Sequence, residues 1–209
     1  FELNAHGSTG GLRGRKHFLY EGGIRVPALI RYPNVTKAGD LSHEIVVGMD
    51  LFVTLTKLAG GEVPNDRPID GIDISKALKG GALPDRAVTW ALSAVSEIEF
   101  AVRRGNWKLL SDGDLQPMEL FNLAEDPLEF FNLIKENPLV VERLDEDIQR
   151  KLSHFLKERM AYRVNGRSPF SSNVRIIATT NIDLDQEVFS KQTFKEDLFY
   201  KLNTFTLEV

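Results

Sequence analysis

Four short apolar segments between residues 87 and 123 constrain the fold of this chain more than any other feature. Their sequences are AVTWAL (87–92), IEFAVR (98–103), NWKLL (106–110) and MELFNL (118–123). Turn-forming residues lie at the ends of these segments, which is typical of β-strands. The dipeptide Arg104-Gly105 lies between the second and third segments and predicts a hairpin. We therefore expect a small antiparallel sheet over residues 87–123.

An amphipathic helix is predicted directly after this sheet, over residues 137–159. Its apolar side chains recur at helical spacing, while the rest of the segment is charged. They are Leu139, Val140, Leu144, Ile148, Leu152, Phe155 and Leu156. Such a helix buries its apolar stripe against a neighbouring layer, so residues 87–158 predict a sheet with a helix packed on one face.

The N-terminal part predicts α/β character over residues 1–80, at the edge of a larger sandwich of helices around a sheet. Residues 24–33 are apolar and predict a mostly buried strand. Residues 45–59 predict a strand end and then a helix with Asp50 as its N-cap and Gly60 as its stop. The apolar positions of this helix are Leu51, Phe52, Leu55 and Leu58. Asp73 is expected to cap a short helix that ends at Leu78.

Composition excludes several classes of chemistry. The chain has 209 residues, a formal net charge of −4 and no cysteine. Disulfides, thiolate nucleophiles and zinc bound by cysteine are therefore absent. No apolar run approaches the roughly 20 residues that span a bilayer, and no direct binding to nucleic acid or membranes is expected. The first residues carry neither a starting Met nor a leader, so the chain is expected to be an internal piece of a longer protein.

A glycine-rich basic segment, GGLRGRKHFLYEGGIRVP (10–27), is the first candidate site. Its cations are Arg13, Arg15, Lys16 and His17. Glycines let a backbone approach a ligand closely, and such cations suit an oxyanion such as sulfate or phosphate. A solvated basic surface loop is the alternative. His6 and His17 could act as ligands or acids, although loop histidines more often do neither.

The residues around this segment resemble the sulfatase family. LRGRKHFLYEGGIRVPALIRYP is similar to the family's second signature, a Gly-x-Lys followed by Tyr-Glu-Gly-Gly-x-Arg-x-Pro. In the same order follow MDLFVTLTKLAG, DRPIDGIDISKALKG, AVRRGNWKLL and ELFNLAEDPLEFFNL, which look like later family segments. The resemblance covers residues 1–158 and implies the C-terminal part of an alkaline-phosphatase-like, mixed α/β (α+β) fold.

This resemblance implies roles for particular residues. Lys16 takes the position of the family's sulfate-contacting lysine, where an ammonium stabilises charge on the sulfate and on the leaving oxygen; the alternative for Lys16 is a solvated lysine. Glu21 and Arg25 are interpreted as structural residues that pin the loop. Asp50, Asp70, Asp73 and Asp126 are interpreted as caps and turns.

Two parts of the family's machinery are missing from this chain. The nucleophile, a formylglycine made within a Cys/Ser-x-Pro-x-Arg motif, has no counterpart, because the sequence contains no such motif. The calcium expected for a full-length sulfatase needs about six oxygen ligands, and the sequence predicts no metal site here. The resemblance thus implies a sulfuric ester hydrolase origin, with a sulfate-ester substrate for the full-length enzyme, but a chain that is inactive alone.

Residues 162–209 resemble a second family, the AAA+ domain of sigma-54-dependent transcriptional activators. NVRIIATTN (173–181) is similar to its strand ending Ala-Thr-Asn, and TFKEDLFYKLN is similar to its Phe-Arg-x-Asp-Leu-Tyr-Tyr-Arg-Leu-Asn. Asn181 takes the position of the sensor that contacts the terminal phosphate of ATP, and a strand-end cap is the alternative. Lys195 and Lys201 replace arginines of the arginine-finger region, and lysine lacks the planar fork of arginine. The loop that cradles ATP/Mg phosphates is absent. The tail is expected to give one strand and a helix near 193–202, poorly packed for lack of partners.

We place the boundary between the two resemblances near residues 160–162. The expected regions are 1–159, of sulfatase type, and 160–209, a partial AAA+ fragment whose partner would be sigma-54 RNA polymerase only in a full activator. We interpret the chain as a fusion of two fragments; the alternatives are a regulator fragment or a non-catalytic module. The resemblances imply an exported or lysosomal setting for one part and the bacterial cytoplasm for the other, which leaves localisation open.

Overall fold

The computed structural model describes residues 7–66, 69–92, 96–158, 160–161, 170–171, 184–190 and 194–202. The chain divides into two compact units. Unit 1 combines Phe1–Arg25 with Ala87–Val209, and unit 2 is Val26–Arg86.

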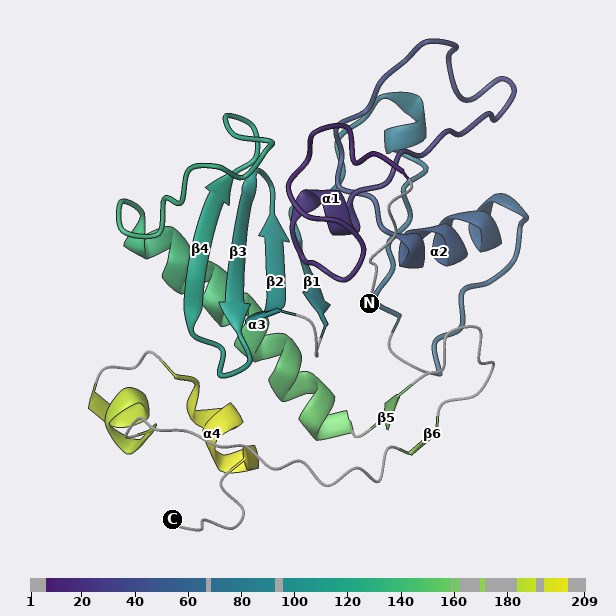
Figure 1. Ribbon diagram of the computed structural model, residues 1–209. Helices are drawn as coiled ribbons and strands as arrows, with labels where there is room; N and C mark the ends of the chain where they lie inside the picture. Colours follow the sequence, from purple (N-terminus) through teal and green to yellow (C-terminus); the bar gives the residue numbers. More distant parts are fainter. Residues whose placement is uncertain are drawn as a thin grey trace. The chain divides into compact units, whose positions relative to one another are not determined.

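The predicted antiparallel sheet is present in unit 1 (Figure 1). Its strands, in spatial order, are β1 (Ala87–Ala91), β2 (Ile98–Arg104), β3 (Trp107–Asp112) and β4 (Pro117–Asn122). The hairpin between β2 and β3 is one residue later than the dipeptide that predicted it, because Arg104 still pairs with Trp107. Gly105 therefore opens the turn, with a φ of 57° that glycine adopts without strain.

Helix α3 (Pro138–Glu158) covers one face of this sheet, as predicted (Figure 1). Leu144 and Ile148 of the helix pack with Val102, Leu109 and Leu120 of the sheet. The prediction was wrong for Leu139, which is 78% exposed. Val141 packs against the core, and residues two positions apart lie about 200° apart around a helix, so Leu139 faces away.

The N-terminal segment covers the opposite face of the sheet. Leu19, Tyr20 and Ile24 pack against a cluster that includes Ala101, Leu110 and Phe121. Helix α1 (Glu21–Ile24) is a single turn within this segment. Burial on both faces explains why β3 is buried over four consecutive residues, from Lys108 to Ser111, instead of alternating.

Unit 2 contains helix α2 (Gly48–Leu58) and the single turn η1 (Ala77–Lys79). The strand predicted over residues 24–33 is wrong: Ile24 ends α1 and residues 25–32 lie outside any helix or strand. Leu29 is fully exposed in this segment. The described residues of unit 2 form no strand with which the segment could pair. Asp73 accepts bonds from Ser75, but the helical turn extends only over Ala77–Lys79, so the predicted helix is reduced to one turn.

Asp50 is the third residue of α2 and not its N-cap, which is Val47. Its carboxylate still satisfies helix-end donors, because it accepts the Val47 N–H at 2.9 Å. It also accepts the Ile72 N–H at 3.0 Å and the Arg86 guanidinium at 2.8 Å. Burial acts to raise the pKa of Asp50, but these hydrogen bonds hold that pKa below its ordinary value.

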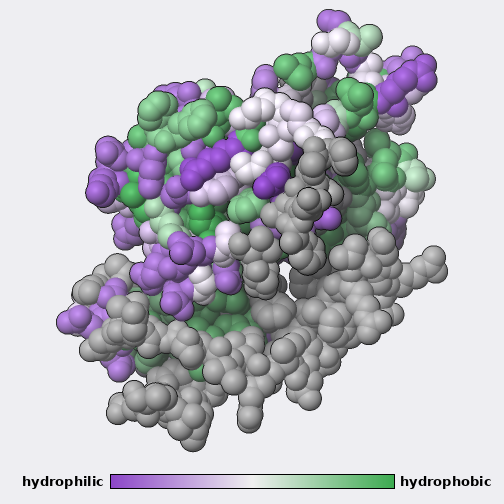
Figure 2. Space-filling view, in the orientation of Figure 1, coloured by the Kyte–Doolittle hydropathy of each residue, from purple (hydrophilic) through white to green (hydrophobic). Residues whose placement is uncertain are grey.

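The apolar residues of α2 lie on the surface of the molecule. Val53 is buried, whereas the residues that predicted the helix are 38–60% exposed: Leu51, Phe52, Leu55 and Leu58. Figure 2 shows hydrophobic residues at the surface over α2. The predicted helix is therefore present, but its predicted apolar face is not covered in this chain.

The described part of the tail around α4 packs on α3, contrary to the prediction that this helix would pack poorly. Helix α4 (Glu196–Leu202) buries Leu198 and Phe199. Gln149 of α3 accepts the Lys195 N–H at 2.8 Å. The tail also has the paired two-residue strands β5 (Met160–Ala161) and β6 (Phe170–Ser171) and the wide helical turn η2 (Gln186–Ser190). The predicted strand 173–181 lies outside the described residues, and no described helix has the length and apolarity to cross a membrane.

Candidate functional site

The basic loop of residues 12–20 folds back over the glycine pair Gly22-Gly23. The Gly22 N–H donates to the Arg13 carbonyl at 2.7 Å, and the Phe18 N–H donates to the Arg15 carbonyl at 3.0 Å. A Cβ on Gly23 would lie 2.0 Å from the Phe18 carbonyl oxygen, and one on Gly22 would lie 2.5 Å from that of Gly14. These two glycines therefore admit the chain's own backbone, and not a ligand as the sequence suggested.

Lys16 lies at the exposed tip of this loop, next to His17. His17 has a φ of 78°, a left-handed conformation that favours glycine and asparagine. Both side chains are exposed. Within the described parts of the chain, Lys16 has no hydrogen-bond or ion-pair partner. The ammonium is thus free to meet an anion, as the predicted role requires.

Arg13, by contrast, contacts three groups of the protein. Its guanidinium donates to the Glu129 carbonyl and the Tyr20 hydroxyl, both at 2.9 Å, and to Glu119 at 3.2 Å. It also lies 3.9 Å from the centroid of the Tyr20 ring, a favourable cation–π geometry. Arg13 therefore ties the loop to the sheet and to Glu129.

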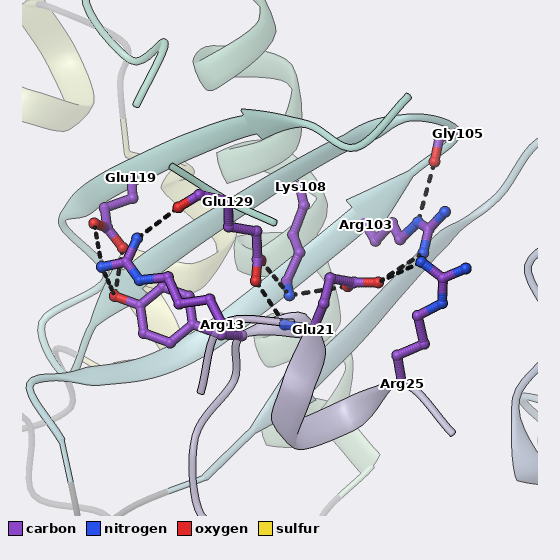
Figure 3. A network of polar contacts seen from close by, with 9 residues as sticks. Arg13, Glu21, Arg25, Arg103, Gly105, Lys108, Glu119 and Glu129 are labelled. Carbon is purple, nitrogen blue, oxygen red and sulfur yellow. Dashed lines mark hydrogen bonds and ion pairs between the residues drawn. The ribbon is translucent and has the colours of Figure 1, made fainter. Parts of the chain in front are cut away.

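A buried ionic cluster lies between this loop and the sheet (Figure 3). The side chain of Lys108 is fully buried, and its ammonium donates to Glu129 at 2.7 Å and to Glu21 at 3.1 Å. Arg103 is 3.6 Å and Arg25 is 3.9 Å from the second oxygen of Glu21. Glu21 and Arg25 are thus structural residues in this chain, as predicted.

Burial and charge act against each other in this cluster. Burial raises the pKa of Glu129 above its ordinary value, although Lys108 favours the ionised form. Burial likewise lowers the pKa of Arg103, opposed by Glu21. Burial and the hydrogen bond to Glu119 raise the pKa of Tyr20, which keeps its hydroxyl protonated. Partners of opposite sign therefore offset part of the cost of burying these charges.

The acidic side chains near the loop do not suit a calcium ion. Glu21, Glu119 and Glu129 each accept from a cationic side chain. Among the residues described, no three histidine or acidic side chains come close enough to hold a metal ion.

The two lysines predicted at arginine-finger positions contact α3 instead of solvent alone. Lys195 lies 3.7 Å from Glu146. The Lys201 ammonium lies 3.3 Å from the Ser153 carbonyl and 3.4 Å from Asp197. Asn181 and His6 lie outside the described residues, so their predicted roles stay predictions. Asp126 accepts the Phe131 N–H at 2.8 Å, which confirms its interpretation as a turn residue.

Sequence reasoning missed Lys108, Arg103 and Glu119, although one signal was available. Side chains alternate between the two faces of a strand, and these three residues share the face of Ala101, Leu110 and Phe121. The residues before and after this lysine in the strand face the helix, so the lysine points to the opposite face of the sheet. There its ammonium must either be exposed to solvent or form an ion pair. The carboxylates that pair with it come from distant segments, which the strand pattern does not reveal.

The fold and the basic loop together resemble the C-terminal part of proteins of the sulfatase class. The family model described as N-sulphoglucosamine sulphohydrolase, C-terminal, matches residues 14–159. The chain belongs to this family. A second model, the Sigma-54 interaction domain, matches residues 139–208. Both matches include α3, so the second begins earlier in the chain than the resemblance seen in the sequence.

Individual relatives agree with the first match. The chain is 34% identical to bovine (Bos taurus) arylsulfatase A over 155 residues, which are 62% of this chain and 30% of the relative. It is 44% identical over 85 residues to N-acetylgalactosamine-6-sulfatase of Canis lupus familiaris, covering 41% of this chain and 16% of that protein. The chain thus spans less than a third of these relatives.

Solved structures give the same result. One comes from a study of the metabolism of multiple glycosaminoglycans by Bacteroides thetaiotaomicron, with a TM-score of 0.58, 26% identity and coverage of 71% of this chain and 33% of the other. Another, the crystal structure of Ps i-CgsB, has a TM-score of 0.60 and 27% identity and covers 69% and 31% of the two chains. These similarities establish the mixed α/β, alkaline-phosphatase-like fold.

Proposed function

We propose that residues 1–159 are the substrate-binding C-terminal part of a sulfuric ester hydrolase and that Lys16 binds the sulfate group. The observation that carries this proposal is the contrast within one loop. Arg13 is bound to the protein by hydrogen bonds and an ion pair, whereas the Lys16 ammonium is exposed and unpaired among the described residues. Arg13 holds the loop in place, and the loop exposes Lys16 to solvent. This arrangement suits the recognition of an oxyanion.

The chemistry proposed for Lys16 is electrostatic. Its ammonium would neutralise charge on the sulfate oxygens and on the leaving oxygen as the ester bond breaks. This sequence carries no Cys/Ser-x-Pro-x-Arg motif from which a formylglycine could form. We therefore propose that this chain binds sulfate weakly and does not turn over sulfate esters by itself.

Titration of the purified chain with inorganic sulfate tests this function, with the amide resonance of Lys16 followed by NMR. We expect a saturable shift in the wild type and its loss in Lys16→Ala. Lys37→Ala is the matched control, since it removes an exposed lysine from unit 2 and should leave the shift unchanged. Equal titrations of all three proteins would contradict a role for Lys16.

Hydrolysis of 4-nitrophenyl sulfate, with calcium added, tests the second part of the proposal. We expect no turnover above the buffer blank. Turnover that disappears in Lys16→Ala would instead identify an active hydrolase and would overturn the interpretation as a fragment.

A second candidate function concerns the tail and rests on the match of residues 139–208 to the Sigma-54 interaction domain. We propose that this segment derives from an activator and does not bind ATP in this chain, because the sequence has no phosphate-cradling loop. The contacts of Lys195 and Lys201 with α3 support this proposal. A fluorescent ATP analogue with magnesium should show no anisotropy change; a change abolished by Asn181→Ala would support nucleotide binding.

A further inference from the structure

The buried ionic cluster beneath the basic loop has a feature that a simple structural ion pair lacks. Arg103 and Lys108 lie directly opposite each other on neighbouring strands and on the same face of the sheet. Two like charges in this arrangement repel each other. Glu21 removes the repulsion, because its two carboxylate oxygens face Lys108 at 3.1 Å and Arg103 at 3.6 Å. Arg103 and Lys108 thus form a pair of cations on the sheet that requires a carboxylate between them.

Glu129 connects this pair of cations to both ends of the basic loop. Its side chain accepts the Lys108 ammonium at 2.7 Å and the backbone N–H of Glu21 at 2.6 Å. Its carbonyl accepts Arg13 at 2.9 Å. Arg13 and Glu21 bracket the segment that carries Lys16, so one residue holds the loop at its start and at its end.

The backbone of Glu129 shows that its position is imposed by these contacts. Its φ is 60°, in the left-handed region that a non-glycine residue enters only at a cost. The residue is fully buried, so a relaxed conformation would leave a buried carboxylate without its partners. The ion pairs, and not local backbone preference, therefore determine where the loop is attached.

We infer that Lys108 and Glu129 are positioning residues for sulfate recognition, which set the loop that presents Lys16 without touching the substrate. This inference rests on the proposed function of Lys16 and deepens it. The sulfate-binding loop has little regular structure of its own, and α1 is a single turn. Its geometry is therefore provided by charges on the sheet, whose strands are rigid compared with the loop.

The test compares variants of the full chain by amide hydrogen exchange and by sulfate titration. In Glu129→Gln the shape is kept but Lys108 loses one carboxylate; in Lys108→Met both carboxylates lose their shared cation. We expect the amides of Gly22 and Phe18 to exchange about tenfold faster relative to those of β2 and β3. We also expect the sulfate Kd to rise about fivefold.

Arg104→Met is the matched control. Arg104 is also a sheet cation paired with a buried carboxylate, Asp147 at 2.9 Å, but it faces α3 on the other side of the sheet. It should destabilise the chain without speeding loop exchange relative to the sheet. Exchange of the loop that keeps pace with the sheet in both cluster variants would overturn the inference, as would selective loosening of the loop by Arg104→Met.

Two further outcomes separate this inference from the proposed function. If the wild type shows no sulfate response, the function of Lys16 fails, and the exchange data still decide whether the cluster positions the loop. If Lys108→Met does not fold, the charge-balanced variant Lys108→Met/Glu129→Gln replaces it, because one charge of each sign is removed and Glu21 retains Arg103. Loop exchange like that of the wild type in this variant would contradict the inference.

Discussion

At the residue scale, the chain depends on a few positions where one side chain decides whether a segment can fold. Gly23 is such a position, since the Phe18 carbonyl oxygen occupies the space where a Cβ would lie. Lys108 is another, because its removal leaves the buried Glu129 without its cation and leaves Glu21 with only the more distant Arg103 and Arg25. Close packing of the backbone accounts for Gly23, and ion pairing with Glu21 and Glu129 accounts for Lys108.

Substitution of Gly23 by alanine should destabilise unit 1 by about 2–3 kcal/mol, because a backbone atom must move to admit the methyl group. Gly48→Ala is the control, since a Cβ there meets nothing within 4 Å, and its effect should be within about 0.5 kcal/mol of zero. Urea unfolding measures both. Equal effects of the two substitutions would show that the close approach is not rigid.

The pH dependence of stability should contain a contribution from Asp145. Burial raises its pKa from 3.8 to about 6, with Glu146 adding to the rise and Gln149 and Lys195 opposing it. One of its oxygens is buried without a hydrogen-bond partner among the described residues. The folded chain therefore binds a proton that the unfolded chain has released, and the free energy of unfolding should fall by about 2 kcal/mol as pH rises from about 4 to about 6.5.

Asp145→Asn removes this titration, since an amide resembles the protonated carboxyl. We expect the variant to equal the wild type near pH 4 and to exceed it near pH 7, as measured by urea unfolding at both pH values. A difference between the two proteins that does not vary with pH would show that Asp145 has an ordinary pKa.

At the element scale, α3 serves two sets of contacts. Its Leu144 and Ile148 pack on the sheet, while Gln149 and Ser153 bind the tail. The hydrogen bond from Ser153 and the ion pair with Lys201 lower the pKa of Asp197, so this contact favours the charged carboxylate. The apolar face of α3 thus packs on the sheet, and its polar side chains bind the tail. Both family models match residues of this helix.

Leu198→Ala should loosen α4, because this leucine is fully buried. We expect the opening free energy of the α4 amides to fall by about 2–3 kcal/mol, from lost burial and the cavity left behind. Hydrogen exchange of α4 measures it. Leu139→Ala, at an exposed position of α3, should change these amides by less than about 0.5 kcal/mol; an equal effect would mean that α4 is not docked in solution.

At the scale of the whole molecule, the two units differ in how they bury apolar residues. Unit 1 has a core on each face of its sheet. Unit 2 buries Val53 and Ile74 but exposes apolar side chains along α2 and in the extended segment before it. Exposed patches of this kind reduce solubility and bind other apolar surfaces.

The double substitution Phe52→Gln/Leu55→Gln should therefore reduce binding of the dye ANS and reduce self-association, with little loss of folded structure. Fluorescence titration and sedimentation velocity measure the two effects. Leu139→Gln, which removes an exposed leucine of unit 1, should change neither as much. Unchanged dye binding in the double variant would mean that the α2 face is covered in solution.

Most of the secondary structure of unit 1 could be predicted because strands and helices leave a local period in the sequence. The four strands, the hairpin and α3 follow from that period. The strand predicted over residues 24–33 was wrong, because an apolar run becomes a strand only where a neighbouring strand pairs with it. The partners of Lys108 were also beyond reach, because Glu21 and Glu129 lie 87 and 21 residues from it along the chain.

The sequence by itself determined the elements of the sheet and its covering helix, the sulfatase resemblance, and the exposed basic loop with Lys16. Only the tertiary structure decided which cations of that loop and sheet are used internally. Arg13 is bound to Glu119 and Glu129, Lys108 to two carboxylates, and Lys16 to nothing among the described residues. The physical reason is that burial and the partners supplied by distant segments decide whether a charged side chain remains available to a ligand.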